Sequence, residues 1–412
     1  MTKLSQHEVM NLLLQLGTML VMGRLFAELA RKLRQPAVVG EIVAGIILGP
    51  TVFGMLFPEA FGSFFEQGNS LLVLDGFVQV AVVMLLFIAG LEVDLHIVFQ
   101  QGRQAVYTSV FGLVIPFIMG FALAYYLPGV FEIKTSSNLL AFALFMGTSM
   151  AITALPVIAR ILMDIGIFKT RMGMLVISSA MINDLIGWLI FSVVLGMIGT
   201  AQNMTITQTI ILTVGFTAVM LTVGRALINR ILPWVNTRFA WPGGVLSVSL
   251  ACCFLAAAFT EYIGIHAIFG AFIIGVAFGD SEHMSERAKE IVHQFINNVF
   301  SPLFFVAIGL KVNFILNFDF WLTLIIVVVA FTGKIVGSGL GTRLGGFNVR
   351  ESLAAGFGMN ARGAMEIILG LVALENGLIG EKLFVSLVIM ALVTSMTSGP
   401  LMKWILAKNQ ET

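Results

Sequence analysis

The sequence predicts an all-α polytopic membrane protein with about 13 transmembrane helices, and two observations carry this prediction. Of the 412 residues, 58% are hydrophobic and 11% are charged, with a mean hydropathy of +0.99. A soluble domain carries roughly 25% charged residues, so this chain has too few polar residues to coat a surface that faces water. The second observation is a series of apolar runs, each about 20 residues long, which is the length that spans a bilayer.

The predicted spans follow one another closely along the chain. They lie near 8–33, 36–56, 72–94, 105–127, 138–163, 170–199, 206–231, 243–262, 264–280, 288–311, 319–342, 351–376 and 381–406. The division between the eighth and ninth spans depends on a short turn, which Glu261 and Gly264 mark. Only a short tail follows Trp404, so we expect a single membrane domain over residues 1–412, without a soluble C-terminal regulatory domain.

The charges of the loops predict the orientation in the bilayer. Alternate loops carry Lys and Arg, beginning with Arg31 and Lys32 and ending with Lys403, whereas the loops between them are poor in basic residues. The positive-inside rule places the basic loops in the cytoplasm. The N-terminus is therefore expected outside and the C-terminus in the cytoplasm. We expect the membrane to be the bacterial inner (plasma) membrane.

Several functional classes receive no support from the composition. A net charge of +1 does not suggest a nucleic-acid partner. The two cysteines, Cys252 and Cys253, are adjacent, which disfavours both a disulfide framework and a metal site. No zinc-protease HExxH motif occurs, and the five histidines lie at predicted span ends or in loops, so an intramembrane enzyme is not expected. We expect no cofactor.

Asp184 is the clearest functional candidate, because it lies in the middle of an apolar span. An ionisable group in the hydrocarbon region costs roughly 2.5–3.5 kcal/mol, so a chain that keeps one usually needs it. Carboxylate oxygens are natural ligands for a hard cation such as Na+ or K+, and the same oxygens take a proton. One group that holds either a cation or a proton is the simplest device for antiport. A protonated structural aspartate is the alternative.

Lys334 also lies in the middle of a predicted span. An unpaired ammonium group in lipid is costly, so we expect Lys334 to face a carboxylate or a water-filled cavity, or to be neutral. A purely structural ion pair is the alternative interpretation.

The fifth span carries a signal for a helix break at membrane depth. Pro156 removes an amide hydrogen bond and clashes with the preceding turn. We expect the hydroxyls of Ser149 and Thr153 to satisfy the backbone groups that the break frees.

The twelfth span offers a counterpart in residues 358–366. This segment contains two glycines, Asn360, and the pair Arg362 and Glu366 at a spacing of i,i+4. Broken helices at corresponding places of two halves are the best sequence indication of a transporter site.

Three acidic residues lie at predicted cytoplasmic helix ends. Glu41 begins the second span, and Glu92 and Asp94 end the third. We expect Glu41 and Glu92 to line the cytoplasmic entrance, although solvated helix ends would explain them as well.

At these residues the chain resembles the monovalent cation:proton antiporter-2 family, which includes Na+/H+ antiporters of the NapA type, the Kef potassium efflux systems and the plant cation/H+ exchangers. The resemblance extends over nearly all of the chain. Four stretches carry it, at residues 35–50, 85–92, 149–162 and 359–366.

The resemblance implies a fold like that of NhaA and NapA, with inverted repeats and two crossed discontinuous helices. Dimer-domain helices are then expected near 8–94 and 243–311, core-domain helices near 105–199 and 319–406, and a linker helix near 206–231. In such proteins the core domain slides past the dimer domain like an elevator. The resemblance implies a homodimer, and any regulator would be a separate subunit.

The resemblance also assigns roles by position. Asp184 falls on the family's essential ion-binding aspartate, and Thr153 falls in the broken helix beside the ion. Lys334 falls on the lysine that pairs with a carboxylate in the electrogenic members. Asn183 stands where those members have a second aspartate. Because an amide cannot bind a proton, the sequence predicts electroneutral 1:1 exchange.

The predicted function is therefore the exchange of K+ or Na+ for H+. The predicted ion-binding residues are Asp184, Asn183, Thr153 and Ser149, and the predicted ion-pairing residues are Lys334, Arg362 and Glu366. Both cations take oxygen ligands, and the likeness to plant exchangers favours K+. A gated cation channel of the Kef kind and an organic-anion carrier on a similar fold are the alternatives.

Overall fold

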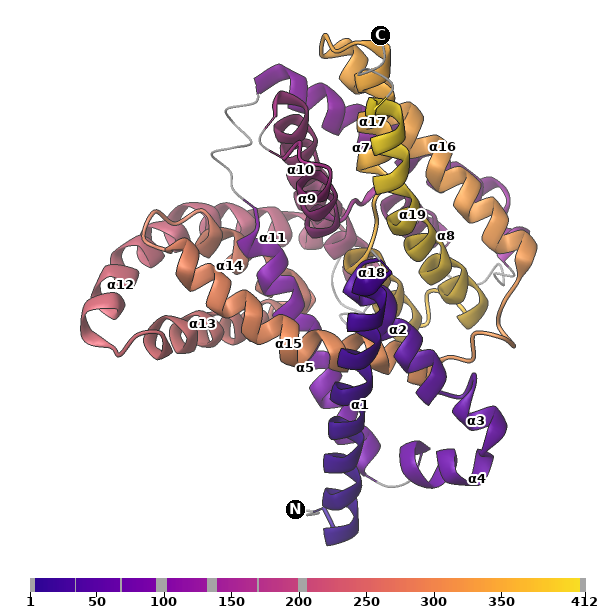
Figure 1. Cartoon of the computed structure of the whole chain (residues 1–412). Coiled ribbons are helices and arrows are strands. Elements are labelled where there is room, and N and C mark those ends of the chain that lie inside the picture. Colours follow the sequence, from indigo (N-terminus) through magenta and orange to yellow (C-terminus); the bar gives the residue numbers. More distant parts are fainter. Residues whose placement is uncertain are drawn as a thin grey trace.

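The computed structural model describes residues 4–33, 35–66, 69–93, 102–131, 139–168, 170–198 and 206–407. Within these ranges every regular element is a helix (Figure 1). The described part of the chain thus confirms the all-α prediction. Asp94 lies outside the described ranges.

The first half of the chain contains α1 (Gln6–Lys32), α2 (Ala37–Leu48), α3 (Phe53–Leu56), α4 (Pro58–Phe61), η1 (Gly62–Glu66), α5 (Ser70–Leu91), α7 (Gly102–Tyr126), η2 (Pro128–Phe131), α8 (Leu139–Ala151), α9 (Leu155–Asp164) and α10 (Arg171–Ile198). The second half contains α11 (Ile206–Val219), η3 (Met220–Gly224), α12 (Arg225–Arg238), α13 (Gly243–Tyr262), α14 (Ala267–Gly279), α15 (Glu286–Lys311), α16 (Phe320–Leu344), α17 (Val349–Met359), α18 (Ala364–Glu375) and α19 (Glu381–Ala407).

Each predicted span has a helical counterpart, but the count of 13 is not confirmed. Among the described residues, 11 helices are long and apolar enough to cross a membrane, and the bent pair α17–α18 raises the count to at most 12. The predicted span 264–280 corresponds to α14, which has only 13 residues. The turn at Gly264, with φ of 82°, and the cap at His266 consume the start of the apolar run. At 1.5 Å per residue, α14 is roughly 20 Å long, which is shorter than the hydrocarbon core.

Polar caps set several helix starts. Asn348 and Glu351 form a capping box at the start of α17, in which each side chain bonds the other residue's backbone amide. Ser285 and Asp319 cap α15 and α16 in the same sense, by accepting a bond from the first turn. Local sequence thus sets the starts of α15, α16 and α17.

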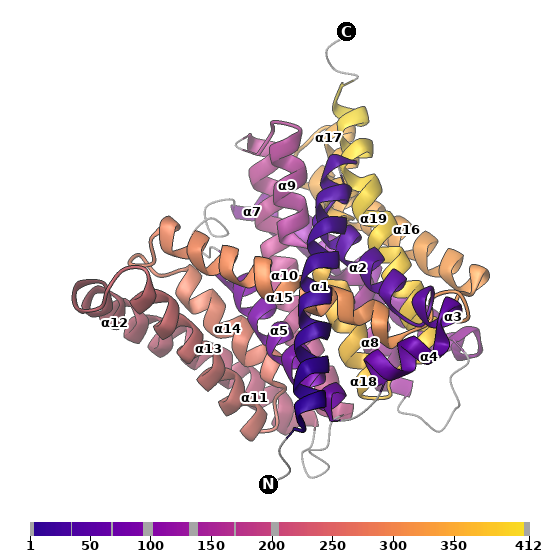
Figure 2. The same cartoon turned by 60° about the horizontal axis from the view of Figure 1, so that its bottom comes forward.

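The helices form two groups (Figure 2). The α15 group consists of α1, α2, α5, α13, α14 and α15, which pack on one another. The α10 group consists of α7 to α10 and α16 to α19. The segment α11–η3–α12 connects the two groups along the chain. These two groups cover the ranges in which the sequence places the dimer-domain and core-domain helices, and their roles as dimer and core domains stay a prediction.

Glycine allows the closest helix contact inside the α15 group. A Cβ at Gly309 of α15 would lie 2.1 Å from the carbonyl carbon of Gly45 in α2. Since no side chain fits there, the two backbones touch, as is common where membrane helices pack through small residues.

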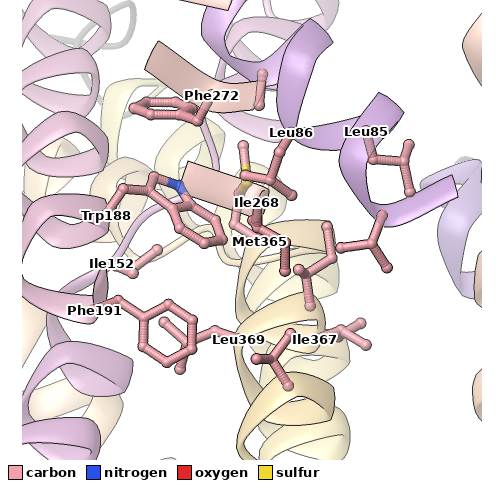
Figure 3. Close-up of a cluster of buried hydrophobic side chains, with 14 of the residues drawn as sticks. Leu85, Leu86, Ile152, Trp188, Phe191, Ile268, Phe272, Met365, Ile367 and Leu369 are labelled. Atoms are coloured by element: carbon pink, nitrogen blue, oxygen red, sulfur yellow. The ribbon is translucent and has the colours of Figure 1, made fainter. Parts of the chain in front are cut away.

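An apolar cluster lies where the two groups meet (Figure 3). The α15 group contributes Leu85, Leu86, Ile268 and Phe272, and the α10 group contributes Ile152, Trp188, Phe191, Met365, Ile367 and Leu369. The rings of Trp188 and Phe272 face each other across this contact with their centroids 5.9 Å apart. Among the side chains labelled in Figure 3, the indole N–H of Trp188 is the only hydrogen-bonding group, and it has no partner among the described residues.

Candidate functional site

The first helix break lies where Pro156 predicted it. Helix α8 ends at Ala151 and α9 begins at Leu155, so that residues 152–154 leave the helical conformation. Pro156 occupies the first turn of α9, where its missing amide hydrogen removes no intrahelical bond.

The second break separates α17 from α18. Helix α17 ends at Met359, α18 begins at Ala364, and the two axes differ by 44°. The amide of Ala154 in the first break donates a hydrogen bond of 3.0 Å to the carbonyl of Ala361 in the second. The two discontinuous helices therefore meet at their breaks, which are separated by about half of the chain.

Two buried cations satisfy the end of α8. The carbonyls of Ser149 and Met150 accept hydrogen bonds from the Arg362 guanidinium, and the carbonyl of Ala151 accepts one from the Lys334 ammonium. The last carbonyls of a helix lack intrahelical partners and carry partial negative charge, so cations are their natural complement.

The expectation that the hydroxyls of Ser149 and Thr153 fill this role was wrong. Ser149 donates to the Glu366 carboxylate instead, and the Thr153 hydroxyl has no hydrogen-bond partner. Basic side chains reach carbonyls that the short hydroxyls leave free.

Arg362 and Glu366 form a buried ion pair on the second broken helix. The Arg362 Nη1 and Glu366 Oε2 atoms lie 3.4 Å apart, and both side chains are almost fully excluded from the surface. Ser395 of α19 donates to the Arg362 carbonyl. Because Glu366 also accepts from Ser149, this pair links α18 to the end of α8.

Asp184 lies in α10 beside the first break and is only 2% exposed. The amide of Leu155, the first residue of α9, donates to Asp184 Oδ2 at 3.3 Å. The backbone of Thr153 also interacts with this carboxylate. Helix N-termini favour anions, so the start of α9 holds one oxygen of Asp184 in place.

The second oxygen of Asp184 is the notable atom of the site. Asp184 Oδ1 is buried and has no hydrogen-bond partner, and the same holds for Thr153 Oγ1 and for both side-chain polar atoms of Asn360. Buried polar atoms are nearly always satisfied in folded proteins, so unpaired ones point to a missing partner. Oxygens of these types are ligands for hard cations. The sequence had marked Asn360 as part of a break without giving it a role.

Lys334 and Asn183 contact each other next to this carboxylate. In the orientation that satisfies both neighbours, the Asn183 amide nitrogen donates to the Ser109 carbonyl at 3.0 Å, and its oxygen accepts from Lys334 Nζ at 3.1 Å. Lys334 also donates to the Gly112 carbonyl at 2.9 Å. The ammonium therefore binds neutral oxygens, whereas the sequence led us to expect a carboxylate or water.

Glu41 lies in α2 and Glu92 at the end of α5, both in the α15 group. Glu41 Oε2 accepts a hydrogen bond from Ser301 at 2.9 Å. Glu92 lies 3.0 Å from the Nε2 atom of His293. Both carboxylates thus have partners in α15. Glu92 is also close enough to Asp184 for a Coulombic interaction between the two carboxylates.

The site holds little negative charge. Among the residues that the structure describes, no group of three or more His, Cys, Asp and Glu side chains could hold a metal ion. One carboxylate with neutral oxygens suits a cation of single charge, because a second carboxylate, Glu366, is already paired with Arg362.

Comparisons with known proteins fit this geometry. Residues 17–408 match the family model described as "Sodium/hydrogen exchanger, transmembrane". The Na(+)/H(+) antiporter NhaS4 of Synechocystis is 32% identical over 396 residues, which is 95% of each chain. Cation/H(+) antiporter 17 of Arabidopsis thaliana is 33% identical over 408 residues, and this chain spans only 48% of its length.

A solved structure shows the same fold. The chain superposes on the sodium proton antiporter MjNhaP1 of Methanocaldococcus jannaschii with a TM-score of 0.66. The sequences are 18% identical, and the match covers 96% of this chain and 97% of the other. The predicted fold class is therefore confirmed.

Proposed function

We propose, on the premise that the chain belongs to the sodium/hydrogen exchanger family, that it exchanges a monovalent cation for a proton at Asp184. The family consists of transporters, which confirms both the resemblance seen in the sequence and the prediction that the chain is not an enzyme. The observation that carries the proposal is the buried Asp184 Oδ1 without a partner at a helix break.

In the proposed cycle, the deprotonated Asp184 binds a dehydrated cation through its free oxygen. Thr153, Asn183, Ser149 and carbonyls of the broken helices are the proposed additional ligands. The unpaired Thr153 hydroxyl supports its inclusion. The Ser149 hydroxyl already donates to Glu366, so it acts as a cation ligand only when it gives up this hydrogen bond.

A proton neutralises Asp184 as a cation does. We propose that the α10 group is the core domain and moves past the α15 group, the dimer domain, only when this charge is neutralised. The apolar cluster of Figure 3 supports this step, since a bare carboxylate moving past such a surface would lose its solvation. When Asp184 is empty and charged, the α10 group then does not move and the site stays open to the same side of the membrane. This prevents uncoupled leak of cations or protons.

The proposed stoichiometry is one cation for one proton. Asn183 binds no proton and accepts from Lys334, and Glu366 is held by Arg362. Asp184 is then the single carboxylate that is free to exchange. Lys334 would stabilise the empty site electrostatically without contacting the carboxylate directly.

The cation is K+ or Na+. NhaS4 is named as a Na(+)/H(+) antiporter, GerN of Bacillus cereus, 28% identical, as a Na(+)/H(+)-K(+) antiporter, and a yeast relative, 30% identical, as a K(+)/H(+) antiporter. The likeness to plant exchangers favours K+. We further propose a homodimer in the bacterial inner membrane, with the N-terminus outside, no cofactor, and any regulator as a separate subunit.

The experiment is a proteoliposome assay with an imposed pH gradient and a pH-sensitive dye. Addition of K+ or Na+ is expected to collapse the gradient for the wild type and not for Asp184→Asn, and the active ion identifies the substrate. A gated channel would instead carry cation current without proton movement. If Asp184→Asn collapses the gradient as fast as the wild type, Asp184 is not the exchange site.

A further inference from the structure

One ion pair joins the two helix groups at the surface. Glu375, the last residue of α18 in the α10 group, accepts a hydrogen bond from Lys311 Nζ at 2.6 Å. Its other carboxylate oxygen accepts from Gln79 Nε2 at 3.0 Å. Lys311 ends α15 and Gln79 lies in α5, so both partners belong to the α15 group.

Lys311 has a second partner inside its own group. Its ammonium lies 3.1 Å from Asp75 Oδ1 of α5. Asp75 therefore keeps Lys311 in place whether or not Glu375 is present. The side chains are partly exposed, at 29% for Lys311, 44% for Asp75 and 26% for Glu375, so water can replace the bond to Glu375 at moderate cost.

This contact lies at the predicted outer end of the helices. The end of α5 that carries Asp75 is near the start of α1, because Asn69 donates to Glu8 at 3.0 Å. Trp188 follows Asp184 along α10, and Met365 to Leu369 follow the second break along α18, both in the direction of this end. These residues form the apolar cluster of Figure 3. The outer side of Asp184 is thus covered by an apolar contact and by the Glu375 contact beyond it.

We propose that Glu375 with Lys311 and Gln79 forms a latch that holds the transporter closed on its outer side, and that each transport cycle opens it. The proposal rests on the proposed function, because only a movement of the α10 group past the α15 group separates these residues. Glu92 and His293, at the opposite end of α5, join two helices of the same group and so would not resist that movement.

The chain offers a matched pair of cross-links that share Lys311. In a Cys252→Ala/Cys253→Ala background, Lys311→Cys/Glu375→Cys places one thiol in each group, and Asp75→Cys/Lys311→Cys places both in the α15 group. Each variant is treated with a bismaleimide that contains a cleavable disulfide spacer. Exchange is measured in proteoliposomes before treatment, after treatment and after reduction.

The proposal predicts that cross-linking Lys311→Cys/Glu375→Cys stops exchange and that cleavage of the spacer restores it. The Asp75→Cys/Lys311→Cys cross-link leaves exchange at the level that the same variant shows before treatment. Continued exchange by the first cross-linked variant would overturn the latch, as would loss of exchange in the second. Failure of the proposed function appears separately, as absence of cation-driven proton movement in the wild type.

A pair of single substitutions tests the latch without cross-linking. Glu375→Gln removes the charge that joins the groups, whereas Asp75→Asn removes a charge inside one group. Glu375→Gln is expected to raise the apparent cation affinity of the outer face relative to the inner face by roughly two- to fivefold. Asp75→Asn is expected to leave that ratio unchanged. Equal ratios in Glu375→Gln and the wild type would contradict the proposal.

Discussion

The amide of Ala154 donates a hydrogen bond of 3.0 Å to the carbonyl of Ala361, and this bond joins the two helix breaks. Around it, the freed carbonyls of α8 accept from Arg362 and Lys334. The start of α9 supplies the Leu155 amide to Asp184. Local interruptions in two helices therefore create one polar centre, in which one carboxylate oxygen and the Thr153 hydroxyl remain unpaired.

Thr153→Ala is expected to weaken cation binding with little effect on stability. Its hydroxyl has no partner in the protein, so removing it breaks no internal bond. As a lost ligand it should raise the apparent KM for the cation by roughly three- to tenfold. Cation titrations of exchange in proteoliposomes measure the change. The control is Thr148→Ala, which removes a hydroxyl bonded to the Leu144 carbonyl of the same helix and should leave KM unchanged.

Arg362→Leu is expected to destabilise the protein more than Glu366→Gln. Loss of one partner of a buried ion pair costs about 3–5 kcal/mol. Arg362→Leu also leaves two carbonyls of α8 without their donor. Thermal unfolding in detergent should show a lower midpoint for both variants, with the larger decrease for Arg362→Leu. The reverse order would mean that the guanidinium does not stabilise the end of α8.

Asn183→Asp is expected to retain exchange and to make it voltage-sensitive. The new carboxylate would lie next to Lys334 Nζ, which is 3.1 Å from the Asn183 amide oxygen, and would add a second site for a proton. The measurement is exchange under a membrane potential set by an ion that the protein does not transport. Asn183→Ser is the uncharged control. If the wild type itself generates a potential from a cation gradient, the single-carboxylate account is wrong.

Exchange is expected to fall at acid pH. A proton and a cation compete for Asp184, so a lower pH favours the form that cannot bind the cation. Below the pH at which half of the Asp184 carboxyls are protonated, the apparent KM for the cation should rise about tenfold per pH unit. Cation titrations at a series of symmetrical pH values measure this slope. A KM that is independent of pH would exclude competition at one group.

The sequence predicted the parts of the site that depend on local pattern. Proline chemistry located the first break at Pro156, and the i,i+4 spacing of Arg362 and Glu366 predicted their ion pair, although Arg362 lies in the break before α18 and not in the helix itself. The turn at Gly264 was expected, but the length of α14 was misjudged, because the apolar run gave no sign that the helix begins only at Ala267, after the cap at His266.

Contacts between distant segments could not be predicted in the same way. Lys334 binds the Ala151 carbonyl across 183 residues, and only the folded chain shows that this ammonium caps a broken helix. Likewise, charges at the ends of α15 and α18 look like ordinary solvated helix ends until Lys311 and Glu375 are seen to meet. The sequence shows where a polar side chain lies in an unusual place, whereas the residue that it contacts depends on how distant helices pack.

The most direct test of the central claim is proton release on cation binding by the purified protein. In weakly buffered solution, at a pH where the site is protonated, addition of K+ or Na+ to the wild type should release close to one proton per cation bound. Asp184→Asn should release none. Cation binding without proton release by the wild type, or equal release by Asp184→Asn, would contradict exchange at this carboxylate.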